Sequence, residues 1–264
     1  MRPRVGLALG AGAARGLAHL GVLEVLEREG IPIDFVAGTS AGAVVGGVYA
    51  AGGDVVRTQG LACSLDWDHL VKVVLPRLGF VRADQLLELV RLLTKGKTFA
   101  QLRTPFAAVA VDIERGEEVV LEEGPVAEAI LASASVPGVF EPQRWNGRLL
   151  VDGGLLNRVP VDVARRHGAD VVIAVDVGLE EPVTPVKNIL DVLNQSFEIM
   201  QREIARYKAT DPADVLIRPE LGRLSGYRLE AAPSIIEAGR VAAQAALPVI
   251  RRVLEQKTPT AAGV

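Results

Sequence analysis

A serine between two glycines is the first residue of this sequence that could do chemistry. The pentapeptide 38–42 reads G-T-S-A-G, with an apolar segment, 31–37, before it and small apolar residues after it. A strand, a G-x-S-x-G turn and a helix form a nucleophile elbow, which holds a serine hydroxyl at the carboxyl edge of a sheet, beside a helix amino terminus. Gly38 and Gly42 would let strand and helix approach without side-chain clashes. We therefore predict that Ser40 is a nucleophile.

A serine nucleophile needs a base, and the chain offers three histidines, His19, His69 and His167. The chain order serine, Asp152, His167 would fit a triad of the α/β-hydrolase type. His167 also follows two arginines and precedes a glycine, which is the usual arrangement at the end of a helix. Because a helix end already explains His167, we favour Asp152 as the base.

Asp152 ends an apolar segment, 148–152, that is expected to form a strand, and two glycines follow it. At the end of a strand it would lie at the same sheet edge as Ser40, with its carboxylate uncovered. The alternative is an ordinary loop aspartate. An exposed carboxylate is a weak base near neutral pH. A Ser–Asp pair therefore requires partial desolvation of the carboxylate, or proton transfer in concert with attack.

A second glycine-rich segment, 10–16, reads G-A-G-A-A-R-G and follows an expected strand at 5–9. Its third glycine falls one place too late for the dinucleotide fingerprint G-x-G-x-x-G, and no Lys-Ser or Lys-Thr pair follows as in a phosphate loop. What remains is a loop of small residues at a helix start, whose free backbone N–H groups could form an oxyanion hole. The alternative is a tight strand–helix turn.

The composition excludes several classes of function. The chain has 264 residues, a net charge of −3, no basic block and 4% aromatic residues, so one or at most two domains and no nucleic-acid-binding face are expected. Cys63, the single cysteine, cannot form an internal disulfide and is expected to pack in the core. The sequence holds no cluster of His, Cys or acidic residues at metal-ligand spacing, so we expect neither a metal nor a cofactor.

The amino terminus has two interpretations. Arg2 and Arg4, followed by an apolar segment, 5–14, imitate a short signal peptide. We favour the other interpretation, a first buried strand at 5–9, because this segment leads directly into the glycine loop. The longest uncharged run, 35–53, is interrupted by the Thr-Ser turn and by several glycines, so we expect no transmembrane helix.

The apolar periodicity predicts one α/β domain, with a mainly parallel sheet between helices on both faces. The region 54–104 is helical but irregular, and the apolar stretch 73–81 within it could be a buried connection, a lid or a membrane-touching loop. We predict a single domain over residues 1–256 and a disordered tail at 257–264. Strands are expected at 5–9, 31–37, 106–112, 117–122, 148–152, 171–177 and 215–217, and helices at 17–29, 43–51, 125–133, 161–167, 188–207 and 234–254.

Four segments together resemble the patatin-like phospholipase family, including its bacterial members. The resemblance covers most of the chain, from residue 5 to residue 177. It implies the patatin-like three-layer fold and a catalytic dyad of Ser40 and Asp152 without a histidine. The matching segments are 10–23, 38–42, 133–140 (S-A-S-V-P-G-V-F) and 152–160 (D-G-G-L-L-N-R-V-P).

The resemblance also implies an oxyanion hole made by backbone N–H groups around Gly12 and Ala13, with Arg15 buttressing the loop. The family's loop is usually richer in glycine, and Ala11 and Ala13 replace two of those glycines. Because glycine alone adopts a positive φ readily, a working donor at Ala13 requires a negative φ there.

The function implied by the resemblance is hydrolysis of a carboxylic ester in a lipid, of the phospholipase or lysophospholipase type, through an acyl-enzyme. A non-catalytic lipid sensor on the same scaffold, or an acyltransferase that uses the same acyl-enzyme, are the alternatives. The expected partners are a lipid substrate and, transiently, a membrane surface. The expected location is the cytoplasm, peripheral to the inner face of the membrane. The sequence does not specify head group, chain length or oligomeric state.

Overall fold

An eight-stranded sheet forms the centre of the part of the protein that the structure describes. The computed structural model describes residues 2–64, 72–73, 81–82, 84–178, 186, 189–208, 212–222 and 231–258. Every strand predicted from the sequence is present. Each strand is hydrogen-bonded to the next in the order β10 (Val215–Ile217), β9 (Val171–Val175), β1 (Val5–Leu9), β2 (Phe35–Thr39), β5 (Phe106–Asp112), β8 (Arg148–Asp152) and β7 (Gln143–Trp145), and β6 (Glu117–Leu121) pairs with β5 as well.

The central strands β10, β9, β1, β2 and β5 are parallel to one another. Strands that are buried on both faces read as continuous apolar runs, and β1 (VGLAL) and β9 (VVIAV) are buried at every residue. The remaining three strands each pair with a neighbour in the antiparallel direction. The strands β6 and β8 are antiparallel to β5, and β7 is antiparallel to β8. The mainly parallel α/β sheet predicted from the sequence is confirmed.

The strand β7 is absent from the predicted elements, although the sequence carries its signal. Asn146 and Gly147 connect β7 to β8, and both have a positive φ, 47° and 76°. An Asn-Gly pair with two positive φ angles is the preferred turn of a two-residue β-hairpin. This hairpin sets the direction of β8, the strand that ends at Asp152.

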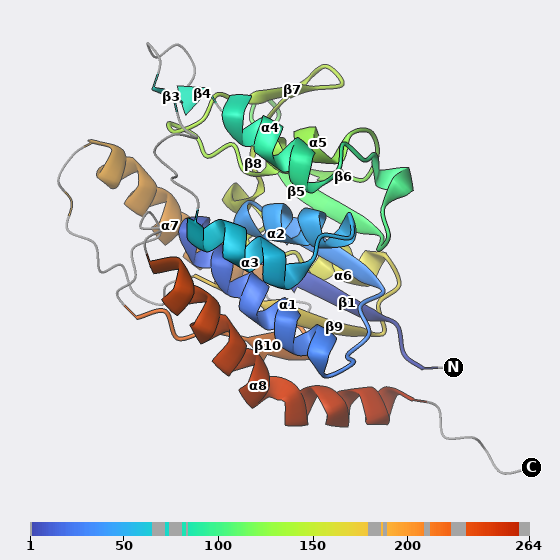
Figure 1. The fold of residues 1–264 in the computed structure, drawn as a ribbon. Helices are drawn as coiled ribbons and strands as arrows, with labels where there is room; N and C mark the ends of the chain where they lie inside the picture. The colour runs from blue at the N-terminus through green and yellow to red at the C-terminus, as the bar shows by residue number, and fades with distance from the viewer. Residues whose placement is uncertain are drawn as a thin grey trace, which may run out of the picture.

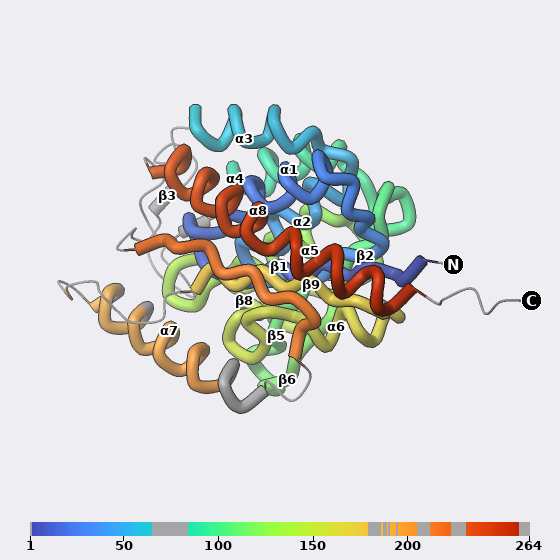
Figure 2. The backbone as a smooth tube through the Cα atoms, turned by 90° about the horizontal axis from the view of Figure 1, so that it is seen from below, coloured from blue at the N-terminus to red at the C-terminus, as the bar shows by residue number. Residues whose placement is uncertain are grey.

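Helices cover both faces of the sheet, so the fold has three layers (Figures 1 and 2). The helices α1 (Ala18–Arg28), α2 (Ala41–Ala50), α5 (Val126–Ser133) and α8 (Ala232–Lys257) share the larger buried cluster with Leu7, Leu9 and Val36. The helix α6 (Val161–Arg166) packs on the other face, with Ala8, Ala37 and Val172. Side chains of a strand alternate between its two faces, so β1 contributes to both layers.

The irregular region 54–104 contains α3 (Val55–Ser64), α4 (Asp84–Leu93), the short pair β3 (Lys72–Val73) and β4 (Val81–Arg82), and the 3₁₀ turn η3 (Phe99–Gln101). Residues 74–80, the larger part of the apolar stretch 73–81, lie outside the described residues, as does His69. The predicted core position of Cys63 is wrong. This residue is exposed at the end of α3, a helix that buries only Val55 and Ala62.

The last two helices of the chain are α7 and α8. The helix α7 (Ile189–Lys208) lies at the carboxyl edge of the parallel strands, at the left of Figures 1 and 2. The helix α8 contains Pro248, and its axis changes direction part-way along, as Figure 1 shows. Lys257, the first residue of the predicted tail 257–264, belongs to α8, while residues 259–264 lie outside the described part. The single domain over 1–256 stays a prediction.

Among the described residues, every helix is either too short or too polar to cross a lipid bilayer.

Candidate active site

Ser40 stands in a strained turn between β2 and α2. Its φ of 55° and ψ of −121° lie outside the regions that a serine prefers. Neighbouring elements hold this conformation. The Ser40 N–H donates to the Ser133 hydroxyl oxygen at 2.9 Å, and that hydroxyl donates to the Val109 carbonyl at 2.6 Å. The end of α5 and the strand β5 therefore fix the elbow that carries the serine hydroxyl.

Both glycines of the elbow are required by close packing. A β-carbon on Gly38 would come 2.6 Å from the α-carbon of Ala43, and one on Gly42 would overlap the carbonyl of Leu9. The start of α2 can therefore cross the end of β1 only because residue 42 has no side chain. The strand–turn–helix geometry that the sequence predicts for residues 38–42 is present.

Asp152 meets Ser40 by a route that differs from the predicted one. The sequence argument places it at the shared carboxyl edge, as the end of another strand in the set, but β8 is antiparallel to β5. Along β5, Val109 pairs with Thr39 of β2, and the next residue, Ala110, pairs with Asp152 of β8. The other side of β5 is taken by β6 at the same residues. The ends of β2 and β8 therefore meet head-on, which brings the two side chains together.

The Asp152 carboxyl group is buried, with 4% of the residue exposed. Burial is the largest influence on its pKa, which is raised to about 6. Two neighbours act in the opposite direction and lower this pKa: the Ser40 side chain, and the Gly154 N–H, which donates to Oδ1 at 2.7 Å. The partial desolvation that a carboxylate needs in order to act as a base near neutral pH is therefore present.

His167 lies at the opposite end of β2 from the serine. Its ring stacks on Phe35 with the ring centroids 4.1 Å apart, and Phe35 begins β2 whereas Ser40 follows its end. Five residues of extended strand separate them by about 16 Å. His167 Nδ1 lies 2.8 Å from the Val163 carbonyl and Nε2 lies 3.1 Å from Glu122. His167 is therefore too far from Ser40 to complete a Ser-Asp-His triad. It stands at the carboxyl end of α6, as the sequence pattern indicates.

His19 supports the glycine loop. Its ring is fully buried, and Nε2 lies 2.8 Å from the Gly10 carbonyl, so Nε2 carries the proton and donates it. Burial lowers the pKa of His19 to about 4, which keeps the ring neutral. No histidine is among the described residues that line the pocket around Ser40.

The glycine loop leaves two backbone donors unused. The N–H groups of Gly10, Ala11 and Arg15 donate to the carbonyls of Val175, Arg158 and Gly12. Within the described residues, no hydrogen bond is donated by the N–H of Gly12 or Ala13, which begin the 3₁₀ turn η1 (Ala13–Leu17). A β-carbon on Gly12 would overlap the Val177 side chain.

Ala13 has a φ of 50°, in the left-handed region. The condition that the sequence argument set for a working donor at Ala13, a negative φ, is therefore not met. The N–H of Ala13 still has no acceptor among the described residues, because a positive φ redirects an N–H group without removing it. This conformation costs an alanine about 1–2 kcal/mol, which explains why a glycine would fit this position better. The sharp turn is imposed by the short connection from β1 into η1 and α1.

The ion pair that Arg15 makes is with a distant helix, and its predicted role in buttressing the loop stays a prediction. Its guanidinium donates from Nη2 to Glu198 Oε1 of α7 at 2.8 Å, and its side chain is almost fully buried. The ion pair ties the glycine loop to a helix more than 180 residues further along the chain. The sequence shows that the loop carries an arginine, but no nearby sequence pattern predicts Glu198 as the residue that pairs with it.

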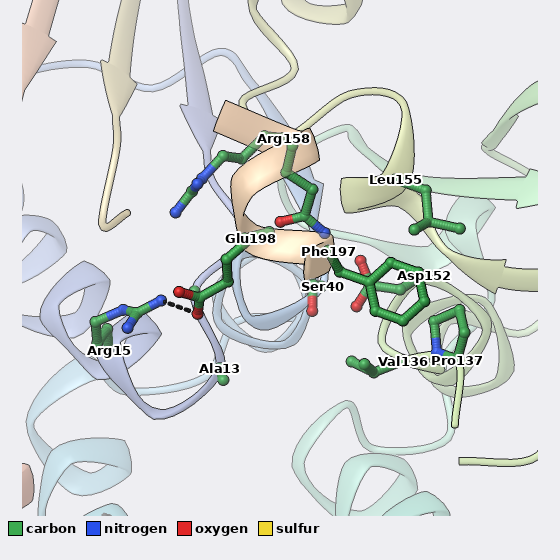
Figure 3. A pocket seen from close by; sticks show the side chains of 13 residues that line it. Ala13, Arg15, Ser40, Val136, Pro137, Asp152, Leu155, Arg158, Phe197 and Glu198 are labelled. Atoms are coloured by element: carbon green, nitrogen blue, oxygen red, sulfur yellow. Dashed lines mark hydrogen bonds and ion pairs between the residues drawn. The ribbon is translucent and has the colours of Figure 1, made fainter. Parts of the chain in front are cut away.

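A small pocket joins these parts, with a volume of about 60 Å³. Pockets that hold a drug-sized ligand measure roughly 300–1,000 Å³, so this pocket is closed to such a molecule. Figure 3 shows α7 crossing the pocket, with Phe197 and Glu198 directed into it. The lining residues are Ala11, Gly12, Ala13, Arg15, Ser40, Val136, Pro137, Asp152, Leu155, Arg158, Phe197, Glu198 and Gln201.

A serine on a strand–turn–helix elbow shares a small pocket with a buried aspartate, at the edge of a mainly parallel sheet with helices on both faces. This is an α/β protein of the class in which such a turn presents a serine at the sheet edge. The comparisons with known proteins agree with this class. The family model described as patatin-like phospholipase matches residues 7–165, which is more than half of the chain. The chain belongs to the patatin-like phospholipase family.

Relatives and solved structures extend this assignment. An uncharacterized NTE family protein of Mycobacterium tuberculosis is 41% identical over 182 residues, covering 68% of this chain and 50% of the relative. Lysophospholipase NTE1 of Candida albicans is 33% identical over 207 residues, covering 75% of this chain and 15% of the relative. The crystal structure of VipD from Legionella pneumophila covers 97% of this chain and 67% of its own, with a TM-score of 0.66 and 14% identity. This chain therefore spans half the length of the mycobacterial relative, and the VipD likeness concerns the fold alone.

Proposed function

We propose that this protein hydrolyses carboxylic esters of lipids through a Ser40–Asp152 dyad and a covalent acyl-enzyme. One observation carries the proposal: the buried Asp152 lines the same pocket as Ser40 on the strained elbow, and its pKa is raised to about 6 although the Ser40 side chain acts to lower it. A base with a pKa near the working pH, in contact with a nucleophile, is the arrangement that covalent catalysis needs.

The proposed reaction has two steps. Ser40 Oγ attacks the ester carbonyl carbon while its proton passes to Asp152, and the tetrahedral intermediate then expels the alcohol, which takes that proton. Water next attacks the acyl-enzyme with Asp152 as base, and the fatty acid leaves as Ser40 recovers its proton. In both steps a negative charge develops on the carbonyl oxygen. The unused N–H groups of Gly12 and Ala13 are the proposed donors to that oxygen.

The lipid substrate class rests on the family and on its relatives. The family is described as patatin-like phospholipase, and the fungal relatives are named lysophospholipase NTE1. The pocket supports the same class because its wall combines apolar side chains, among them Val136, Leu155 and Phe197, with the serine and the carboxylate.

The direct test is active-site labelling combined with product analysis. Wild-type protein treated with a fluorophosphonate should gain the mass of the probe on the peptide that contains Ser40, and should release fatty acid from lysophosphatidylcholine. Absence of both results would leave a lipid sensor as the function. If added alcohol diverts most of the acyl group into a new ester, the protein is an acyltransferase that uses the same acyl-enzyme.

Two substitutions in the glycine loop test the proposed oxyanion hole. Gly12→Ala places a β-carbon where the Val177 side chain already lies, so the loop must shift and its donors must move. We expect kcat to fall about 100- to 1000-fold, the usual effect of losing one such donor. Ala13→Gly keeps the N–H and relieves the positive φ, so kcat should stay within about tenfold.

Gly60→Ala is the matched control for these loop variants, because open space surrounds Gly60 on α3. It should leave ester hydrolysis unchanged. If Gly12→Ala folds with a wild-type melting curve and hydrolyses esters at the wild-type rate, the oxyanion hole lies elsewhere.

We also propose that the outer face of α7 contacts the lipid surface. This face is apolar and exposed: Ile189, Val192, Leu193, Ile199 and Met200 lie on one side of the helix and are 38–66% exposed. An exposed apolar patch marks an interaction surface, and an amphipathic helix can lie in a membrane interface on such a face. The opposite face of α7 covers the pocket, so a lipid surface under α7 would meet the site where its ester is to be cleaved.

Flotation with phosphatidylcholine vesicles tests this contact. Ile189→Glu and Met200→Glu should each reduce the bound fraction severalfold, because a charge on the buried side of an interfacial helix opposes insertion. Val241→Glu, at an exposed apolar position of α8, is the control and should bind like wild type. If all three variants bind the vesicles equally well, α7 is not the membrane contact. The stretch 73–81 would then be the remaining candidate, or the protein would have no such contact. The cytoplasmic location stays a prediction, which cell fractionation can check.

A further inference from the structure

Two buried arginines line the same pocket as the nucleophile. Arg15 is 2% exposed and Arg158 is 8% exposed, and both contribute to the pocket wall. Burying a guanidinium is costly unless ion pairs and hydrogen bonds compensate for the lost water. The hydrogen-bond partners of these two groups therefore decide what this side of the pocket is built to hold.

The described partners of these two arginines leave part of their hydrogen-bonding capacity unused. A guanidinium offers five N–H donors. The Nε atoms of both Arg15 and Arg158 are buried and have no hydrogen-bond partner among the described residues. Among the described residues, Asp176 Oδ1 lies 3.7 Å from Arg158 Nε. Asp176 also lies near Arg218, with Oδ2 3.7 Å from Arg218 Nε, and Oδ1 accepts the N–H of Gly178.

The electrostatics favour a further anion here. The pKa of Arg158 is lowered, chiefly by burial and in part by the positive charge of Arg15, while Asp176 and Glu198 act against this shift. Figure 3 shows the guanidinium groups of Arg15 and Arg158 on the side of the pocket where the Glu198 carboxylate lies. Glu198 is thus an anion seated beside two arginines, and it belongs to α7, the helix that closes the pocket.

We propose that Arg15 and Arg158 form a phosphate subsite, which Glu198 occupies in the closed protein and which the phosphate of a lipid substrate takes over when α7 moves away. This inference rests on the proposed function. A phosphodiester resembles the carboxylate in presenting two charged oxygens, and arginine binds both groups through paired hydrogen bonds. Arg15 lies two residues after Ala13 in the loop of the proposed oxyanion hole, so a phosphate held here sits close to the ester of the same molecule.

The exchange explains how a closed pocket can admit its substrate. The pocket volume of about 60 Å³ excludes a lipid while α7 stays in place, and the ion pair between Arg15 and Glu198 holds α7 there. A ligand that binds only the open form has its apparent affinity reduced by the fraction of molecules that are open. A phosphate that displaces Glu198 opens the pocket, whereas a neutral ester of the same chain length has nothing to exchange for the ion pair.

The test measures binding of non-hydrolysable ether lipids, so it does not depend on catalysis. The probes are 1-O-hexadecyl-glycero-3-phosphocholine, the phosphate-free 1-O-hexadecyl-glycerol and inorganic phosphate, titrated into the wild type and its variants. Glu198→Gln should bind the phosphate-bearing ether lipid about fivefold more tightly than wild type, because the competing carboxylate is gone. Arg158→Gln should bind it about tenfold more weakly, the effect of losing a charged hydrogen-bond partner. Arg166→Gln, at an exposed arginine of α6, should bind like wild type.

The gain of affinity makes the proposal falsifiable even if Arg158→Gln fails to fold, since damage to the fold does not tighten binding. If Glu198→Gln binds the phosphate-bearing lipid no more tightly than wild type, or gains equally for the phosphate-free lipid, the subsite is refuted. If inorganic phosphate alone shows the full gain, the subsite takes free phosphate and not a lipid head group. A protein that shows the binding pattern but takes no fluorophosphonate label would overturn the proposed function and leave the subsite standing.

Discussion

Ser40→Ala is expected to abolish lipid ester hydrolysis and fluorophosphonate labelling while the fold is retained. The change removes one oxygen atom, the proposed nucleophile, and leaves the backbone turn that Gly38 and Gly42 permit. Loss of a nucleophile from a serine hydrolase typically lowers kcat by about 10⁶-fold, so residual turnover should lie at background. Stability should change little, because alanine and serine meet the same strain at a φ of 55° and the backbone N–H still donates to Ser133.

Ser64→Ala is the control for this variant, because Ser64 is an exposed serine of α3 whose hydroxyl donates only to the Leu61 carbonyl. It should keep both labelling and turnover. If purified Ser40→Ala hydrolyses the lipid at the rate of Ser64→Ala, the elbow serine is not the nucleophile.

The sheet and the elbow could be predicted because their signals are local. A buried parallel strand reads as an apolar run, and a G-x-S-x-G between a strand and a helix indicates a sharp turn. Gly38 and Gly42 are required by contacts with Ala43 and Leu9, residues that lie in elements that the sequence also predicts.

The meeting of Ser40 with Asp152 could be predicted only in part. The sequence correctly indicates that both residues end strands, but the direction of β8 depends on the hairpin at Asn146 and Gly147. The position of Asp152 follows from its pairing with Ala110 of β5, one residue beyond the partner of Thr39. Pairing between strands is a long-range property, and no pattern within a single strand reveals it.

The closure of the pocket by α7 could not be predicted from the sequence. The periodicity indicates an amphipathic helix at 188–207, and such a helix normally turns its apolar face inward. Here several apolar side chains of α7 are exposed, and Glu198 points into the pocket toward Arg15. The orientation depends on an ion pair between residues 183 positions apart, which the amphipathic pattern alone does not indicate.

Asp152→Asn is expected to lower kcat/KM by several orders of magnitude, to about the level that remains when a triad aspartate or base is lost, roughly 10⁴-fold. Asparagine keeps the shape of the side chain and can still accept the Gly154 N–H, but it cannot take a proton from Ser40. His167→Ala should leave kcat/KM unchanged, because His167 contacts Phe35, Val163 and Glu122 at the far end of β2. The opposite result for these two variants would restore a Ser-Asp-His triad.

The pH dependence follows from the same carboxyl group. As a base it works only when ionised, and its pKa is about 6. Wild-type kcat/KM should therefore rise as the pH increases through about 6 and level off above it. A profile that stays flat from pH 5 to pH 8 would contradict the assignment of Asp152 as the base.

Stability should depend on pH in the opposite direction to activity. The pKa of Asp152 is about 6 in the folded protein, against an ordinary value of 3.8 for an aspartate in water, so between these values the folded state binds more protons than the unfolded state. The free energy of unfolding therefore decreases as the pH rises through this window, by about 3 kcal/mol in total. An asparagine side chain is never charged and escapes this loss, so Asp152→Asn should be more stable than wild type at pH 7 by up to about 3 kcal/mol.

Urea unfolding of wild type and Asp152→Asn at pH 4 and at pH 7 measures this difference. The variant should show its larger advantage at pH 7, and most of that advantage should disappear at pH 4, where the aspartate is protonated in the folded state. If Asp152→Asn is the less stable protein at pH 7, the buried carboxylate is stabilised by its surroundings. Its pKa would then lie below the ordinary value of an aspartate, and Asp152 would be too weak a base for the step assigned to it.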